Sequence, residues 1–164
     1  MVFDVRPLLR TPGSRERFQF TMDLSQLDFN GRCPVSRPVE VSGEVRNSAD
    51  ILTLEMTART VLDARCDRCG KAFEQEKVTR YACVLAEERE SEDSDIVLVT
   101  GGTVDLEELA REAFILDMDT RTLCSEDCKG LCPRCGANLN DGPCGCKREV
   151  DPRLAALAAL LDKE

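Results

Sequence analysis

Residues 124–146 read CSEDCKGLCPRCGANLNDGPCGC and hold six of the ten cysteines of the chain. A further pair, Cys66 and Cys69, lies upstream in RCDRCG, which repeats the C-x-x-C-G form of Cys132 and Cys135. Thiolates at this spacing suit zinc because the short loop lets both sulfurs take corners of one tetrahedron. The sequence therefore predicts two closed, structural zinc sites with these eight ligands: Cys66, Cys69, Cys124, Cys128, Cys132, Cys135, Cys144 and Cys146.

The eight ligands can be divided between two sites in two ways. In the first partition, the last four cysteines form a local site, and Cys66 and Cys69 join Cys124 and Cys128 in the other. In the second, the two C-x-x-C-G pairs share one metal and the remaining four cysteines share the other. We favour the first because a short local loop costs less entropy to close, although each doubling of loop length costs only ~0.6 kcal/mol. The glycines and asparagines of that loop also suit a tightly wound site.

Two kinds of iron–sulfur cluster are alternatives to zinc at these cysteines. Thiolate spacing alone does not exclude an iron–sulfur cluster. The spacing of Cys128, Cys132 and Cys135 coincides with that of a radical-SAM cluster, but a chain of 164 residues is too short for the usual barrel. Cys33 and Cys83 have no partner at chelating spacing, and Cys83 is predicted to be a small buried residue within a strand.

Alternating apolar and polar residues recur in the part of the chain before residue 86. They predict four β-strands, at residues 18–24, 39–45, 51–62 and 72–85. The last two strands form a hairpin whose turn carries Cys66 and Cys69, with Gly70 in the positive-φ conformation that such a turn requires. A short apolar strand at residues 96–99 is expected to close one edge of the sheet.

The N-terminal arm, residues 1–17, is expected to lack regular structure apart from a short edge strand near Phe3. Pro7, Pro12 and Gly13 are the reason, because these residues interrupt helices and strands. Its arginines give the arm a modest basic character.

A helix is predicted to begin after Asp105, which forms a capping box with Glu108. Its apolar residues fall on one stripe that should face the core: Leu106, Leu109, Ala110, Ala113 and Phe114. A second, terminal helix is predicted at residues 154–161, where the sequence alternates alanine and leucine behind Pro152.

These elements predict an α+β fold, with a mainly antiparallel β-sheet or partly open barrel, a helix, a C-terminal four-cysteine zinc segment and a short terminal helix. We expect a β-rich domain with the zinc-knuckle hairpin over residues 1–103. The helix, the cysteine-rich segment and the terminal helix occupy residues 104–164. The two parts are expected to pack as one unit.

Negative charge is concentrated in one segment. Residues 87–119 contain twelve acidic residues and two arginines, a net charge of −10 in a chain whose total is −9. Each zinc held by four thiolates adds a further dianion. This balance disfavours binding of the whole molecule to nucleic acid, which needs clustered cations, and suits a basic protein partner. A solvated loop and helix face is the alternative interpretation of the acidic segment.

The composition argues against an enzyme and against export. The chain has no histidine and one tyrosine, which removes the commonest general base and most nucleophile–base pairs. Acidic pairs such as Asp117 and Asp119 have no recognisable catalytic frame, and we expect them to be solvated. The absence of a long apolar run or signal peptide predicts a cytoplasmic protein, in a compartment that keeps thiols reduced.

Three strings carry a family resemblance. RCDRCGKAF at residues 65–73, CKGLCPRCGANLN at 128–140 and CGC at 144–146 resemble the YceD family, the large ribosomal RNA subunit accumulation proteins. The resemblance follows most of the chain in order, through the β-rich middle, the acidic segment, the helix and the cysteine cluster. It implies a role in accumulation of 23S rRNA and in assembly of the large ribosomal subunit, and it supplies no catalytic residue.

Charge and resemblance together suggest a non-enzymatic, zinc-stabilised factor that binds a basic ribosomal protein or a pre-ribosomal large-subunit particle through residues 87–119. Neither a membrane nor a small-molecule substrate is expected. The alternative is direct binding of 23S rRNA by arginine-rich patches and the lysines near them: Arg6, Arg10, Arg15, Arg17, Arg65, Arg68, Lys71, Lys129, Arg134, Lys147 and Arg148.

Overall fold

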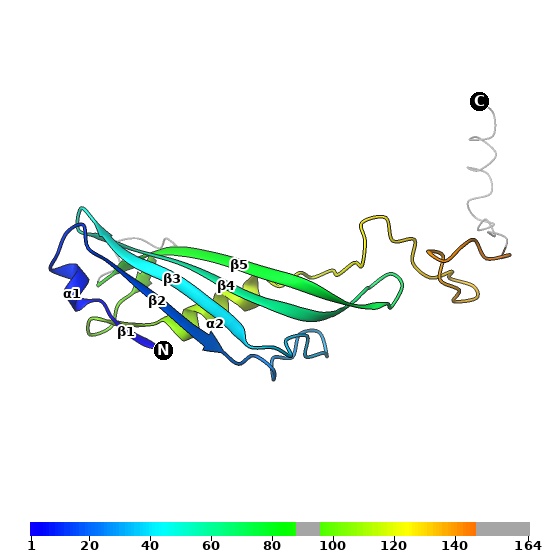
Figure 1. The fold of residues 1–164 in the computed structure, drawn as a ribbon, viewed down its shortest axis with the longest axis horizontal. Helices are drawn as coiled ribbons and strands as arrows, with labels where there is room; N and C mark the ends of the chain where they lie inside the picture. The colour runs from blue at the N-terminus through cyan, green and yellow to red at the C-terminus, as the bar shows by residue number, and fades with distance from the viewer. Residues whose placement is uncertain (88–95, 147–164) are drawn as a thin grey trace, which may run out of the picture.

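A long, open β-sheet is the main element of the structure, a computed structural model that describes residues 1–87 and 96–146. The strand order is β2-β3-β4-β5-β6, of which Figure 1 labels β2 to β5. All neighbours are antiparallel except β5 and β6, which are parallel. The predicted α+β fold with a mainly antiparallel β-sheet is therefore confirmed. The described sheet is open and does not close into a barrel. The strands are β2 (Arg15–Met22), β3 (Val39–Ser48), β4 (Ile51–Arg65), β5 (Ala72–Ala86) and β6 (Ile96–Leu98).

The N-terminal arm is more regular than expected. β1 (Val2–Asp4) pairs antiparallel with β7 (Thr103–Asp105). The helix α1 (Arg6–Leu9) follows β1 in the chain. The prediction that the prolines exclude regular structure here was wrong at Pro7. This residue lies in the first turn of α1, where a backbone N–H has no helical partner and the fixed φ of proline suits the helix.

The core lies on one face of the sheet, against α2 (Leu106–Leu116) (Figure 1). Along β4, residues with even numbers such as Leu52 and Leu54 are buried on this face. The predicted apolar stripe of α2 packs against them, with Leu106, Ala110, Ala113 and Phe114 buried and Leu109 half-buried. The predicted N-cap is confirmed, because the Asp105 carboxylate accepts hydrogen bonds from the backbone N–H groups of Glu107 and Glu108.

Lys77 joins the C-terminal end of α2 to β5. Its side chain is only 9% exposed, and its ammonium lies 3.0 Å from the Asp117 carboxylate and 3.9 Å from that of Asp119. The ammonium also donates to the Asp117 carbonyl, and Thr79 donates to the Asp117 carboxylate at 2.8 Å. The expectation that Asp117 and Asp119 are merely solvated was therefore wrong, because strand alternation places Lys77 and Thr79 on the covered face beneath them.

Asp117→Ala is expected to lower the free energy of unfolding by about 1–2 kcal/mol. It leaves the Lys77 ammonium buried with a weaker partner, and the cost is below that of a fully buried pair because Asp117 is half-exposed. The hydrogen bond from Thr79, and then Lys77, hold the pKa of Asp117 below its ordinary value of 3.8. Urea unfolding should therefore show a difference from wild type that is complete above about pH 5 and shrinks as the pH falls below that ordinary value. An Asp119→Ala control should change stability less.

β4 and β5 carry the first cysteine pair beyond the core. The turn between them contains Cys66 and Cys69, and Gly70 has the predicted positive φ of 71°. Cys83 is buried as predicted, and Cys33 is exposed.

The predicted terminal helix at residues 154–161 lies outside the described residues, and the division of the chain at residue 103 stays a prediction. No helix in the described ranges is long and apolar enough to cross a membrane.

Candidate metal centres

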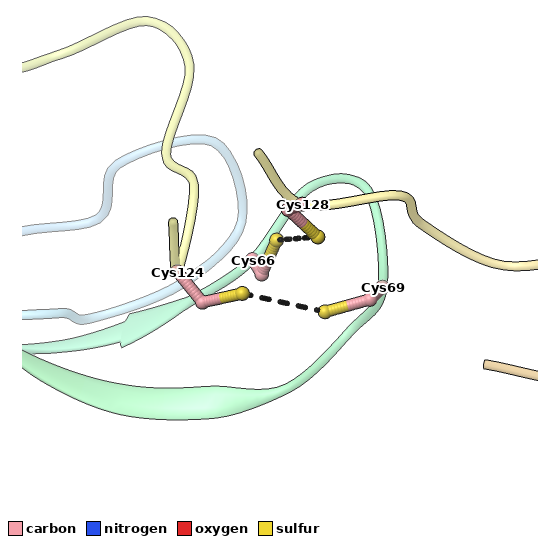
Figure 2. A group of neighbouring side chains, drawn as sticks. All are labelled: Cys66, Cys69, Cys124 and Cys128. Carbon is pink, nitrogen blue, oxygen red and sulfur yellow. Dashed lines mark hydrogen bonds between the residues drawn. The ribbon is translucent and has the colours of Figure 1, made fainter. Parts of the chain in front are cut away.

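Four cysteines from distant parts of the chain meet at the tip of the β4–β5 hairpin (Figure 2). Cys66 and Cys69 come from the turn itself, and Cys124 and Cys128 from the segment after α2. The Cys66 and Cys128 sulfurs are 3.7 Å apart, and the Cys69 and Cys124 sulfurs are 3.6 Å apart. All four sulfurs lie within 4.8 Å of one another.

These distances fit a tetrahedral zinc thiolate site. Zinc–sulfur bonds of about 2.3 Å in a tetrahedron place each pair of sulfurs about 3.8 Å apart, close to both measured distances. A disulfide would require about 2.05 Å. Four protein ligands leave no position for a substrate, so the site would be structural. Zinc is the ion that this donor set favours, and iron in a thiolate site is the chemical alternative.

Hydrogen bonds hold the two segments of this first site together. The backbone N–H of Asp67 donates to the Thr122 carbonyl at 2.9 Å, and the backbone N–H of Thr122 donates to the Asp67 carboxylate at 2.6 Å. The Arg68 guanidinium donates to the Cys128 carbonyl at 2.8 Å. Cys66, Cys69 and Cys128 are buried, with Phe73 and Leu123 packed against them.

The other four cysteines form a second group within one short segment: Cys132, Cys135, Cys144 and Cys146. Their C-x-x-C-G turn has the same backbone geometry as the first. The Gly136 N–H donates to the Cys132 carbonyl at 2.9 Å, as the Gly70 N–H does to the Cys66 carbonyl at 2.8 Å. Both glycines have positive φ, 72° and 71°. The grouping of all eight cysteines is that of the first partition, while their role as metal ligands stays a proposal.

Backbone N–H groups in each turn favour one ionised thiol. Burial opposes ionisation of Cys66, but the backbone N–H groups of Cys124, Cys69 and Arg68 lower its pKa to about 6. The N–H groups of Cys135 and Arg134 lower the pKa of Cys132 to about 6. Each group therefore holds a thiolate near neutral pH, as a metal ligand requires.

In each group, the closeness of the other sulfurs raises the pKa of one cysteine. Burial and the neighbouring sulfurs of Cys69 and Cys66 raise the pKa of Cys124 to about 12. The nearby sulfur of Cys135 raises that of Cys146 to about 12. Four sulfurs this close repel one another once ionised, so a divalent cation between them would relieve the repulsion.

Asn140 links the two groups. It lies in the loop between Cys135 and Cys144, yet its side-chain amide donates to the Cys128 sulfur of the first group at 3.4 Å. Its carbonyl oxygen accepts from the backbone N–H of Lys129 at 2.8 Å. The sequence predicted no role at the metal site for either Asn140 or Arg68, and it indicated Arg68 only as a candidate for contact with rRNA. Each acts on Cys128, which is 60 residues from Arg68 and 12 from Asn140 in the chain.

Asn140→Leu is expected to weaken metal retention at the first site about tenfold, as loss of a hydrogen bond to a ligand does. The change preserves side-chain size and removes the donor to Cys128. Competition with a chelator, followed by native mass spectrometry, should show one zinc released earlier than in wild type and the other unchanged. Asp141→Asn, in the same loop, should behave as wild type, and equal retention by both variants would contradict the role of Asn140.

Cys144→Ser combined with Cys146→Ser is expected to reduce the zinc content from two per chain to one. The retained metal should occupy the first site, because its four ligands are unchanged. Elemental analysis with native mass spectrometry measures the stoichiometry. Loss of both metals would contradict independent folding of the first site, and iron with visible absorption in the wild type would contradict zinc.

Comparisons with known proteins agree with the family resemblance. The family model described as "Large ribosomal RNA subunit accumulation protein YceD" matches residues 54–161. An Arabidopsis thaliana protein, "Large ribosomal RNA subunit accumulation protein YCED homolog 1, chloroplastic", is 26% identical over 147 aligned positions, covering 71% of this chain and 46% of its own length. The chain thus spans less than half of that relative.

Two bacterial proteins are similar over more of their length. An uncharacterised protein of Mycobacterium leprae is 30% identical over 173 aligned positions, covering 98% of this chain and 77% of its own. The Bacillus subtilis protein YlbN is 25% identical over 169 aligned positions, covering 100% and 98%. No solved structure matches the chain.

Proposed function

The chain belongs to the YceD family of large ribosomal RNA subunit accumulation proteins, and from this premise we propose that it is a non-enzymatic, zinc-stabilised factor for 23S rRNA accumulation and assembly of the large ribosomal subunit. It acts by binding a basic ribosomal protein or an rRNA–protein intermediate. Its two metals have a structural role, and its cytoplasmic location keeps the thiolates reduced.

The location of the negative charge is the observation that carries this proposal. Among residues 96–119, six acids accompany one arginine: Asp105, Glu107, Glu108, Glu112, Asp117 and Asp119. Glu108 and Glu112 are exposed on α2. A negative surface of this kind attracts a basic protein and repels bare phosphate.

The sheet offers little support for the alternative, direct binding of 23S rRNA. The outward residues of β2 to β5 include no aromatic side chain on which a base would stack. Some arginines on this face lie opposite acids, as Arg59 lies opposite Glu40, and Arg17 pairs with Glu44 at 3.4 Å. Arg6 is likewise paired with Asp4, at 2.7 Å. Paired arginines bind phosphate less well, because contact with it competes with the carboxylate.

A salt series distinguishes the two modes of binding. Purified, zinc-loaded protein is titrated with naked 23S rRNA fragments and, separately, with RNA-free proteins from purified large subunits. We expect weak binding to the fragments and specific retention of one or a few basic proteins. Tight binding to naked rRNA with a steep dependence on salt concentration would instead support the direct mode. Turnover of rRNA by the metal-loaded protein alone would contradict a non-enzymatic role.

A further inference from the structure

An open groove with an apolar floor lies between α2, β6 and the β1–β7 pair. Its volume is about 360 Å³, and its apolar lining consists of Val2, Val97, Leu98, Val104 and Leu109. Of these residues, Val2 is 68% exposed and Leu98 is 49% exposed. Exposed apolar side chains that line one groove can contact an apolar side chain of a partner.

The rim of this groove is acidic. Asp105, Glu108 and Glu112 line it, and none of the described residues that line it is basic. Asp105 is already engaged by the Met1 amine at 3.0 Å and by the N-terminus of α2. Glu108 and Glu112 are one helical turn apart and therefore face the same side. Neither has an ion-pair partner within residues 1–87 and 96–146.

One wall of the groove is a sheet edge. β6 is the last strand of the described sheet and pairs with β5 on its inner side. An edge strand presents main-chain N–H and C=O groups that an extended segment of another chain can bind. The groove thus combines three features of a peptide site: an apolar floor, an edge strand and two carboxylates that form no ion pair with the described part of the chain.

We propose that this groove binds an extended, basic segment of a ribosomal protein. An apolar side chain of the segment lies against Leu98 and Val2, and its lysines or arginines lie against Glu108 and Glu112. This inference rests on the proposed function. It replaces residues 87–119, the surface expected to contact the partner, by one groove. Charge complementarity favours a basic protein over RNA, because the two carboxylates repel phosphate.

Two pairs of variants test the groove. The groove is altered by the single variant Leu98→Ser and by the double variant Glu108→Gln with Glu112→Gln. The control for the first is Ile51→Ser. The control for the second is the double variant Glu40→Gln with Glu55→Gln. Ile51 is 54% exposed, and the two control glutamates are exposed on the uncovered face of the sheet. Each zinc-loaded, immobilised protein is offered the RNA-free proteins of purified large subunits, and the retained proteins are quantified by mass spectrometry. Thermal unfolding confirms that every variant is folded.

We expect the groove variants to bind the retained basic protein at least about tenfold more weakly and the controls to bind as wild type does. The effect of the glutamate pair should shrink as salt is added. Equal binding by all folded variants would overturn the groove while leaving the proposed function in place. Failure of the wild type to retain any ribosomal protein would instead contradict the partner class on which both rest.

A photo-cross-linking amino acid at position 98 identifies what occupies the groove. Cross-links to one peptide of a ribosomal protein, with basic residues beside an apolar one, support the proposal. Cross-links to residues 151–164 of the same chain, to a second copy of it or to rRNA would each overturn it. The same cross-linker at position 51 is the control and should give no cross-link to that peptide.

Discussion

Replacing Cys66 and Cys69 by serine is expected to remove one zinc per chain and to detach the cysteine-rich segment from the sheet. The first four-cysteine group is the place where residues 124–128 meet the β4–β5 hairpin. Beyond the metal, a few hydrogen bonds, such as those between Asp67 and Thr122, join the two segments. Structural zinc contributes folding free energy directly, so losing half of its ligands abolishes this attachment.

Three measurements check this result. Native mass spectrometry should find one zinc, held by the second group. Limited proteolysis should cut residues 117–131 much faster than in wild type, because opening of this segment no longer breaks metal–thiolate bonds. The far-ultraviolet circular dichroism of the sheet should persist, since the core between the sheet and α2 is a separate cluster from the buried cysteines of the hairpin tip. Cys33→Ser, at an exposed cysteine outside both groups, should keep two zincs and the wild-type cleavage pattern. Unchanged proteolysis of the double variant would show that the metal is not what holds the segment.

Gly43→Ala is expected to destabilise the sheet by about 3 kcal/mol, a large effect for one methyl group. A Cβ at this position would lie 2.3 Å from the Glu55 carbonyl oxygen, 2.6 Å from the ring of Phe18 and 2.9 Å from the Met56 Cα. Two of these atoms belong to the backbone of β4, so they cannot move aside without separating β3 from β4. Phe18, opposite Gly43 on β2, fills the space that a side chain would occupy.

Ser42→Ala is the matched control for this substitution. Ser42 is adjacent to Gly43 but is exposed on the uncovered face, so its replacement should change stability by less than about 0.5 kcal/mol. Urea unfolding of both variants measures the difference. A further double variant, Gly43→Ala with Phe18→Leu, should recover part of the loss if the clash with the ring contributes to it. Wild-type stability of Gly43→Ala would contradict the close approach of the strands.

Alternation was sufficient to predict the strands, because a side chain in a strand faces the opposite side from its neighbours. The pattern of residues 51–62 and 72–85 correctly predicted the long hairpin, and Gly70 its turn. The same rule, applied to Lys77, would have placed its ammonium on the covered face with Thr79. The position of its partners Asp117 and Asp119 could not be predicted, because it depends on where α2 ends against β5.

The sequence by itself determined which residues have metal-binding chemistry, since thiolate spacing within a turn is a local property. It also determined the secondary structure of the hairpin and of α2, through periodicity and capping. Only the tertiary structure decided which cysteines meet, because pairing Cys66 with Cys128 depends on how the chain after α2 returns to the hairpin tip. It likewise brought Asn140 to the Cys128 sulfur and placed Leu98 beside Glu108 and Glu112 in one groove. Contacts between residues so far apart in the chain depend on packing of whole elements, which no local pattern records.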